Sequence, residues 1–412
     1  MRMLYVVTLL ATVATSTARD LCGVAVNGTT GMIGAGSSHT CARNSLGAVA
    51  CWGRNDDGQL GDGSTTKSNT PVPVFNLTNA VAIAAGKYHT CAVLSTGGAM
   101  CWGSDSNGQL GDGGTNTDRH TPVDVKNLTN AIAITAGDGH TCALLSTGKV
   151  KCWGLNRDGQ LGDNSTTDRH TPVDVKNLTN AVAIATAHSH MCALLSTGGV
   201  KCWGSDSIGQ LGDGEGIGGL QDIPVDVDGI TDAVAIAAGH YHTCAVLSTG
   251  GAKCWGENNY GQLGDGTNNN RYTPEDVLGI DNAVAIDIMY RHTCAVLSTG
   301  GAKCWGSNSN GQLGDNSTQV RQNSFQDTPV PVLGIDNAVA IALGTSHTCA
   351  LLDNGGLKCW GYNNIGQLGD NSTTDRHTPV DVLYFDACFQ TITAPFSSPT
   401  PGIHLKGCTI KL

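Results

Sequence analysis

A fifteen-residue pattern occurs seven times along this chain: His-Thr-Cys, nine further residues, and then Cys-Trp-Gly. In the fourth copy Met191 replaces the threonine. Successive copies are 50 to 55 residues apart, as measured between their tryptophans, and a self-similar period of this length predicts a propeller or a solenoid. The copies hold all seven tryptophans of the protein and begin at His39, His89, His140, His190, His242, His292 and His347.

Each copy also predicts a β-hairpin with a disulfide across its strands. A Ser-Thr-Gly-Gly turn, or a near variant, lies between two short β-rich runs. In the third copy this places Cys142 opposite Cys152, where ordinary strand twist can bring the sulfurs to bonding distance. We therefore expect the pairs Cys41–Cys51, Cys91–Cys101, Cys142–Cys152, Cys192–Cys202, Cys244–Cys254, Cys294–Cys304 and Cys349–Cys359.

The same residues could also suggest a metal site or a cysteine nucleophile with its base. Zinc normally takes four ligands, whereas each copy offers at most one histidine and two cysteines. Seven repeated catalytic pairs are also not expected, since each cysteine has a partner at a fixed distance. We expect a packed, hydrogen-bonded strand histidine, and no metal, cofactor or catalytic residue.

Three further segments complete the repeating unit. Gly-Gln-Leu-Gly-Asp occurs in all seven copies, and it lacks the Lys-Ser/Thr and the helix of a phosphate-binding loop, so the aspartate is expected to cap its own turn. Thr-Pro-Val-x-Val predicts an edge strand, and Ala-Val-Ala-Ile-Ala-Ala-Gly predicts an inner strand of small residues. Four strands per unit predict an all-β, seven-bladed β-propeller of four-stranded antiparallel blades. The blades are expected at about 31–75, 80–125, 131–175, 181–227, 233–277, 283–332 and 338–384.

The first residues and the cysteine content predict a secreted protein. Residues 1–18 have the basic start, apolar run and small-residue end of a signal peptide, and 17 cysteines fit an oxidising compartment. No later segment is apolar for long enough to cross a membrane. The net charge of −11 disfavours nucleic acid and anionic lipid as partners.

The ends of the chain hold the three cysteines that lie outside the hairpins. We expect residues 19–30 to form a seam segment, residues 31–386 the propeller and residues 387–412 a Pro/Ser-rich tail. A Cys22–Cys388 bond would lock the ring at its seam, and Cys388–Cys408 is the competing pair. The first pairing leaves Cys408 free for an intermolecular bond in an otherwise monomeric protein.

The motifs W-G-x-N-x-x-G-Q-L-G-D-G, T-P and A-x-G-x-x-H-T-C-A-L resemble the repeat of the regulator of chromosome condensation family over residues 31–384. The resemblance implies a seven-bladed propeller whose ring closes between the chain ends. Members of that family include a nuclear exchange factor for a small GTPase, light sensors that use interface tryptophans, parts of ubiquitin ligases and exported bacterial β-lactamase inhibitors. This chain departs from the nuclear type in its signal peptide, its hairpin cysteines and its lack of a basic tail. We therefore expect a secreted, disulfide-stapled protein-binding or scaffold propeller that is not an enzyme. The alternatives are a guanine-nucleotide exchange factor and an inhibitor of the β-lactamase-inhibitor type.

Positions that differ among the copies are candidates for binding a protein partner. The two residues before each repeated histidine vary most, and they are expected to ring one face, either as interface anchors or as solvated turn residues. Two longer loops, 214–223 and 316–327, are either functional or merely tolerated insertions. The candidates from both sets are Lys87, Tyr88, Asp138, His188, His240, Tyr241, Tyr290, Arg291 and Phe325.

Seven Asn-x-Ser/Thr sequons occur in the chain. They are either glycosylation sites, which would exclude a close-packed interface there, or copied turn chemistry, because asparagine and threonine favour turns. The asparagines are Asn27, Asn76, Asn127, Asn164, Asn177, Asn316 and Asn371.

Overall fold

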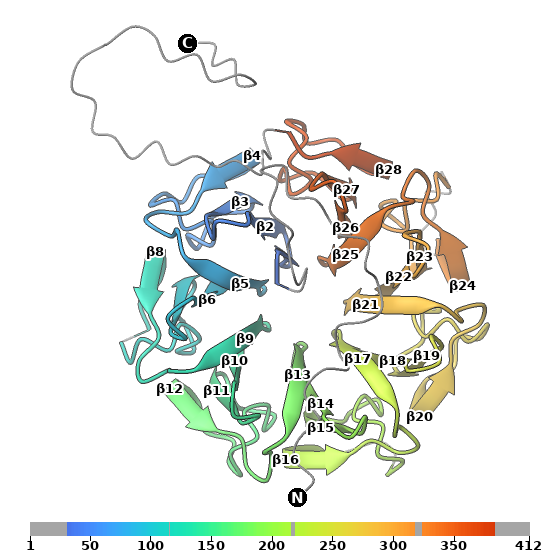
Figure 1. Ribbon diagram of the computed structural model, residues 1–412, viewed down its shortest axis with the longest axis horizontal. Coiled ribbons are helices and arrows are strands. Elements are labelled where there is room, and N and C mark those ends of the chain that lie inside the picture. Colours follow the sequence, from blue (N-terminus) through green and yellow to red (C-terminus); the bar gives the residue numbers. More distant parts are fainter. Residues whose placement is uncertain (1–30, 115, 216–218, 318–323, 384–412) are drawn as a thin grey trace, which may run out of the picture.

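A computed structural model describes residues 31–114, 116–215, 219–317 and 324–383, which form seven four-stranded antiparallel sheets around one axis (Figure 1). Blades 1 and 2 contain β1 (Ile33–Ala35), β2 (His39–Arg43), β3 (Val49–Gly53), β4 (Ser68–Pro73), β5 (Ala80–Ala85), β6 (His89–Leu94), β7 (Ala99–Gly103) and β8 (Arg119–Asp124). Blades 3 and 4 contain β9 (Ala131–Ala136), β10 (His140–Leu145), β11 (Val150–Gly154), β12 (Arg169–Asp174), β13 (Ala181–Thr186), β14 (His190–Leu195), β15 (Val200–Ser205) and β16 (Leu220–Asp226). Blades 5 and 6 contain β17 (Ala233–Ala238), β18 (His242–Leu247), β19 (Ala252–Gly256), β20 (Arg271–Asp276), β21 (Ala283–Met289), β22 (His292–Leu297), β23 (Ala302–Ser307) and β24 (Phe325–Pro331). Blade 7 contains β25 (Ala338–Leu343), β26 (His347–Leu352), β27 (Leu357–Gly361) and β28 (Arg376–Asp381).

The predicted seven-bladed propeller is therefore confirmed, and so is the hairpin at the centre of each blade. In blade 3, Cys142 faces Cys152, and all seven expected disulfides are present, with Cα atoms 4.0–4.1 Å apart. The proline-containing strand is the outer edge of every blade, where its missing N–H interrupts no ladder. In the part of the chain that the structure describes, no helix has the length and apolarity of a membrane span.

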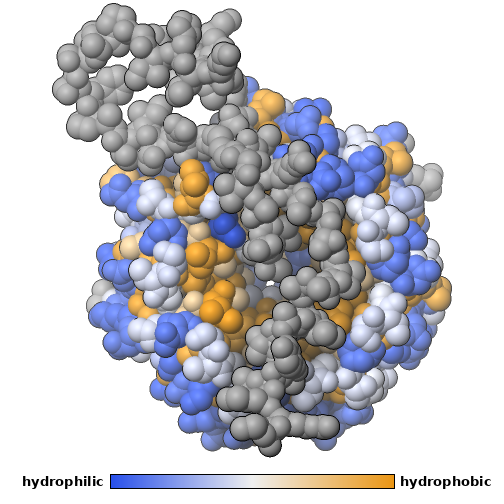
Figure 2. Space-filling model, in the orientation of Figure 1, coloured by the Kyte–Doolittle hydropathy of each residue, from blue (hydrophilic) through white to orange (hydrophobic). Residues whose placement is uncertain are grey.

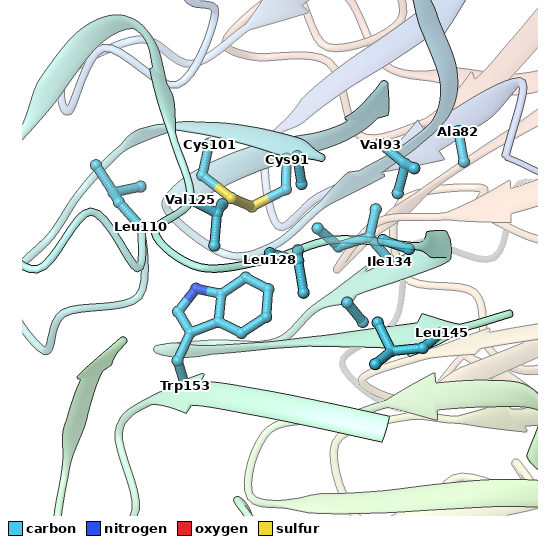
Figure 3. Packing of buried hydrophobic residues seen from close by; sticks show 13 residues of the cluster. Ala82, Cys91, Val93, Cys101, Leu110, Val125, Leu128, Ile134, Leu145 and Trp153 are labelled. Carbon is cyan, nitrogen blue, oxygen red and sulfur yellow. A yellow bond between two sulfur atoms is a disulfide. The ribbon is translucent and has the colours of Figure 1, made fainter. Parts of the chain in front are cut away.

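The hydrophobic core lies between neighbouring blades. Between blades 2 and 3, the ring of Trp153 points back toward blade 2 and packs in one cluster with Leu110 and Val125, beside the Cys91–Cys101 bond (Figure 3). A Cβ atom placed on Gly111 would lie 2.6 Å from the indole nitrogen of Trp153. The second glycine of Gly-Gln-Leu-Gly-Asp is thus needed so that the backbone can lie directly against the tryptophan of the next blade.

A repeated set of buried hydrogen bonds links the blades. The backbone carbonyl of Gln59 in blade 1 accepts hydrogen bonds from the Trp102 indole (2.9 Å) and the Thr90 hydroxyl (2.8 Å) of blade 2. Because that hydroxyl gives its only proton to Gln59, it must accept from His39 Nε2, which lies 2.9 Å away. The repeated histidines of this network therefore carry a proton on Nε2. Burial lowers the pKa of His39 to about 3, so its imidazole is neutral at pH 7.

The expectation of a hydrogen-bonded histidine is confirmed in six copies and wrong for His140. The six histidines lie 2.8–3.1 Å from a threonine hydroxyl of the next blade. Opposite His140 stands Met191, which has no hydroxyl, so neither ring nitrogen of His140 has a hydrogen-bond partner. One substitution in the repeat thus leaves a buried imidazole unsatisfied.

The ring closes between blades 7 and 1 with the same contacts. Trp52 and Thr40 both donate to the Gln367 carbonyl, at 3.0 Å, and Thr40 lies 2.9 Å from His347. Blade 1 takes its outer strand, β4, from its own repeat, and blade 7 takes β28 from its own. The seam segment 19–30, the tail and the bonds expected for Cys22, Cys388 and Cys408 lie outside the described residues.

The loop after each Cys-Trp-Gly is organised by an asparagine in five blades. Asn156, for example, accepts from the Leu161 amide and donates to Asp163 and to the carbonyl of Ser165. The Gly-Gln-Leu-Gly-Asp aspartates accept from the amide two residues later in six copies, as expected of a cap. Aspartate replaces the asparagine in blades 2 and 4, and burial raises the pKa of Asp105 and of Asp206 to about 6.

The six described sequon asparagines all adopt a left-handed backbone, with φ between 52° and 64°, and all are exposed. Other copies place glycine at the same sites, such as Gly63 and Gly229, also with positive φ. Turn chemistry therefore accounts for the repetition, since asparagine and glycine tolerate this conformation best. Glycosylation of these exposed side chains stays a prediction, and Asn27 lies outside the described residues.

The histidine network predicts that the same substitution lowers the free energy of unfolding by different amounts in two blades. His89→Leu should lower the free energy of unfolding by about 1–3 kcal/mol more than His140→Leu, because only His89 donates to a threonine. Urea unfolding of both variants with intact disulfides measures the difference. Equal losses would show that the histidine–threonine bonds contribute nothing net.

The two buried aspartates predict a pH-dependent loss of stability. Each folded-state pKa, about 6, lies above the ordinary value of 3.8, so stability falls as pH rises from about 4 to about 6 and stays lower above that. Asp105→Asn and Asp206→Asn should each stabilise the protein at pH 7 by roughly 1–3 kcal/mol and leave it unchanged below pH 4. The matched control Asn156→Asp should do the reverse. Thermal unfolding across pH tests this, and no gain at pH 7 would contradict it.

Candidate functional site

The turns between the first and second strands of the blades carry the most variable residues of the repeat. In most blades a tight turn forms because the residue after the inner strand donates to the carbonyl of the repeated histidine, as Gly86 does to His89 at 2.9 Å. The backbone amide of Lys87 also donates to Gly137 of the next blade at 3.1 Å. These bonds hold the turns of neighbouring blades side by side, at the inner ends of strands such as β5 and β9 (Figure 1).

The second residue before each repeated histidine forms what we call the axial ring: Ser37, Lys87, Asp138, His188, His240, Tyr290 and Thr345. The Lys87 ammonium lies 2.8 Å from Asp138 Oδ2, and His188 Nδ1 lies 2.5 Å from the same oxygen. The His188 and His240 rings stack with centroids 4.2 Å apart, and Ser37 and Thr345 share a hydrogen bond of 2.8 Å. Four consecutive blades, 2 to 5, thus meet in one cluster of side chains.

Aromatic rings and cations extend this cluster. His240 packs edge-on against Tyr241, with centroids 4.0 Å apart, and against Tyr290, at 4.6 Å. Arg291 lies over the rings of Tyr290 (4.6 Å) and Tyr260 (4.3 Å). Such cation–aromatic contacts hold long, charged side chains in place beside the rings.

Tyr88 extends the same face at blade 2. Its ring lies 5.1 Å from the Arg54 guanidinium carbon and 5.4 Å from the Lys87 ammonium. The structure therefore places eight of the nine partner candidates together, from Lys87 round to Arg291.

Sequence reasoning missed Arg54 and Tyr260. The hairpin register contains the signal for Arg54, because His39 pairs with Gly53, so the residue after Gly53 must lie beside the turn. The amide of Arg54 indeed donates to the Ser38 carbonyl of that turn at 2.9 Å. Tyr260 lies in the loop before Gly-Gln-Leu-Gly-Asp, and no spacing rule points to it.

Contacts within the axial ring set its charges. Burial by itself would raise the pKa of the Asp138 carboxyl, but hydrogen bonds from His188 and Lys87 hold that pKa below its ordinary value. Burial, together with the neighbouring His188, lowers the pKa of His240 to about 4. At neutral pH the cluster therefore presents an ionised carboxylate beside an uncharged imidazole.

The backbone of Tyr290 is strained. Its φ of 41° is the one positive value among the described residues that belongs to neither glycine nor asparagine. In blade 6 the strand β21 runs on to Met289, which pairs with His292, so only two residues remain to make the turn. Such two-residue turns require positive φ, and this strain accompanies the presentation of the Tyr290 ring.

The remaining candidates lie elsewhere. Phe325 begins the outer strand β24, at the periphery of the propeller, and pairs with Ser307, so it does not join the axial ring (Figure 1). Leu220, from the other long loop, begins the outer strand β16 in the same way. Residues 216–218 and 318–323 of these loops lie outside the described residues.

A carboxyl group that the sequence reasoning passed over lies on the inner strand of blade 6. Asp287 occupies a place where other blades have alanine, threonine or glycine, and its Oδ2 accepts from the Leu343 amide of blade 7 at 2.8 Å. Desolvation raises the pKa of Asp287 to about 7. This carboxyl group joins blades 6 and 7 through the Leu343 backbone and, among the residues that the structure describes, forms no hydrogen bond or ion pair with a side chain of the axial ring.

The repeated His, Cys and Trp residues do not present accessible reactive groups. The fourteen hairpin cysteines form disulfides, and the seven repeated histidines and seven tryptophans are fully buried. The surface around them is hydrophilic along the rim in the view of Figure 2, and hydrophobic residues are more frequent nearer the centre. The described side chains of the axial ring and its neighbours are instead a mixture of aromatic, cationic and anionic groups.

Family models, individual proteins and a solved structure all resemble this chain. The RCC1-like domain profile matches residues 125–395, and regulator of chromosome condensation (RCC1) repeats match residues 47–93 and 97–144. The chain is 32% identical over 363 residues to the ultraviolet-B receptor UVR8 of Arabidopsis thaliana, covering 86% of this chain and 70% of the receptor. It is also 32% identical over 163 residues to the human probable E3 ubiquitin-protein ligase HERC4, which is 39% of this chain and 15% of the ligase. The crystal structure of Prp20p from Saccharomyces cerevisiae superimposes with a TM-score of 0.73, at 21% identity, over 82% of this chain and 87% of that one.

Proposed function

Since the chain belongs to the regulator of chromosome condensation repeat family, we propose that it is a secreted, disulfide-stapled propeller that binds a protein partner with the face around the axial ring. The observation that carries the proposal is the division of the repeat into constant and variable positions. The constant residues build the disulfides and the joints between blades, whereas the variable ones gather in one cluster. Tyrosine, arginine and histidine are frequent anchors of protein interfaces, and this cluster is rich in them.

Solved relatives of the same fold support a protein partner in general terms. Yeast RCC1 (Prp20) has been crystallised with bound Kap60, and the Prp20p structure was described with its binding to Gsp1p and histones. At 21% identity these likenesses concern the fold, so no partner is transferred by name. The net charge of −11 also disfavours polyanionic partners.

The two alternative functions differ in the compartment and the partner that they require. An exchange factor for a small GTPase acts in a reducing compartment, where seven short-range disulfides would not persist. An inhibitor of the β-lactamase type would use the same kind of face on an exported propeller, so it differs from our proposal only in the partner. Light sensing through interface tryptophans has no counterpart here, because all seven tryptophans are buried in the joints.

Secretion predicts a processed, fully oxidised protein. Protein recovered from the medium of its native cells should begin near residue 19, and non-reducing peptide mapping should recover all seven hairpin disulfides. N-terminal sequencing and mass spectrometry give both results. An intact Met1, or free thiols at Cys142 and Cys152, would rule out this localisation.

If the face around the axial ring binds a partner, removing its tyrosine rings should weaken binding without unfolding the protein. The triple variant Tyr88→Ala, Tyr241→Ala, Tyr290→Ala should recover at least ten-fold less partner from native medium, because it removes three aromatic anchors, and its Tm should change by no more than about 3 °C. The measurement is affinity capture with quantitative mass spectrometry, followed by titration of the captured protein.

Phe75→Ala, Leu278→Ala, Leu333→Ala is the matched control. These three side chains are 45–54% exposed on the connectors between blades, and this variant should bind as the wild type does. Equal losses of binding and Tm in the tyrosine variant would make the tyrosines packing residues. Nucleotide release from a small GTPase, or inhibition of a β-lactamase, by the purified protein would instead favour the corresponding alternative.

A further inference from the structure

Three neighbours in the axial ring carry atoms that can bind metal ions. The ligand atoms of Asp138, His188 and His240 all lie within 4.8 Å of one another, and the three residues come from blades 3, 4 and 5. Among the residues that the structure describes, this is the one group of three such side chains. We propose that these three side chains bind one divalent transition-metal ion of the zinc or copper type.

The repeat itself does not account for this combination. The same position holds serine, lysine, tyrosine or threonine in the other four blades, and those blades have the same four strands. Neither the carboxylate nor the two imidazoles are therefore needed to build a blade. Their convergence depends on the closed ring, which brings Asp138 close to His240 although their blades are not neighbours.

The donor set selects the class of ion. Two imidazole nitrogens with one carboxylate suit Zn²⁺, Cu²⁺ and related ions, whereas Ca²⁺ and Mg²⁺ prefer oxygen ligands only. Zinc bonds to histidine nitrogen at about 2.0–2.1 Å, so the three donors must draw together and the stacked imidazoles must turn. The His188 and Asp138 side chains are 33% and 20% exposed, which leaves them room to move and an ion access from solvent.

Three protein ligands leave at least one coordination position open. In zinc sites of this kind that position takes water or a group from another molecule. Tyr241 and Tyr290 border the site through His240. The metal inference stands without any protein partner, because it rests on the three side chains alone.

Removing Lys87 should strengthen metal binding, whereas removing one of the three ligands should weaken it. Its ammonium lies 2.8 Å from the same Asp138 oxygen that a metal ion would use, so it competes with the ion for that carboxylate. The Lys87 side chain is 34% exposed and can swing away when the ion binds. Replacing it with methionine removes the competing charge and keeps the length of the side chain.

The experiment is a titration of the full-length, oxidised protein with Zn²⁺ by calorimetry, and with Co²⁺ by its visible absorption, which reports the coordination geometry. We expect one equivalent per chain and the absorption of a four- or five-coordinate Co²⁺ with nitrogen and oxygen ligands. His188→Ala and Asp138→Asn should each weaken Zn²⁺ binding at least ten-fold, whereas Lys87→Met should strengthen it several-fold. His170→Ala, on the outer strand β12, is the matched control and should change nothing.

Folding is checked separately by the Tm of each metal-free variant. Zinc binding that is unchanged in both His188→Ala and Asp138→Asn would overturn the proposal, since the ion would then lie elsewhere. The absence of saturable binding by a folded wild-type protein would overturn it as well. Weaker Zn²⁺ binding in Lys87→Met would show that Lys87 and the ion do not compete for the Asp138 carboxylate, and this result would contradict the proposed site.

Discussion

The structure depends on one buried backbone carbonyl per joint. The glutamine of Gly-Gln-Leu-Gly-Asp turns its carbonyl toward the next blade, where it accepts from a tryptophan and, in six joints, from a threonine that is in turn bonded to a histidine. A carbonyl buried between blades without these donors would be costly, and so would a buried indole without an acceptor. Hydrophobic packing drives the blades together, but these bonds fix how each blade is set against the next. The glycine that follows the glutamine and leucine is needed because the indole lies directly against the backbone there.

The architecture could be predicted from the sequence because every element of a blade lies within about 50 residues and recurs seven times. The hairpin disulfides followed from strand register alone. The joints could not be predicted, because their bonds connect different repeats: nothing in the spacing of Trp102 and Gln59 says that they meet. The same holds for the axial ring. The turn residues were recognisable as variable, but only the closed ring shows that Asp138 reaches His240 across an intervening blade. The costs of Met191, Asp105 and Asp206 also appear only once their neighbours are known.

The constant and the variable positions of the repeat have different roles. Disulfides and joints make each blade rigid without help from the turns, so the second residue before each histidine is left free to vary. In this chain it has become lysine, aspartate, two histidines and tyrosine in five successive blades. The strained backbone of Tyr290 is a feature that costs stability and serves no blade. Strain at a position that varies between repeats supports the proposal that this face binds a partner.

Among residues 31–383 that the structure describes, the first and last blades exchange no strand, and the joint between them is built from the same contacts as the other joints. The six connectors between successive blades are therefore close to equivalent in length and geometry. A circularly permuted gene, with new termini at the connector near Leu278 and the described ends of the propeller joined by a linker, should give the same ring with the same seven hairpin bonds. For protein engineering this makes the order of the blades a free variable, so that the side chains which meet on the axis could be rearranged by shuffling whole units.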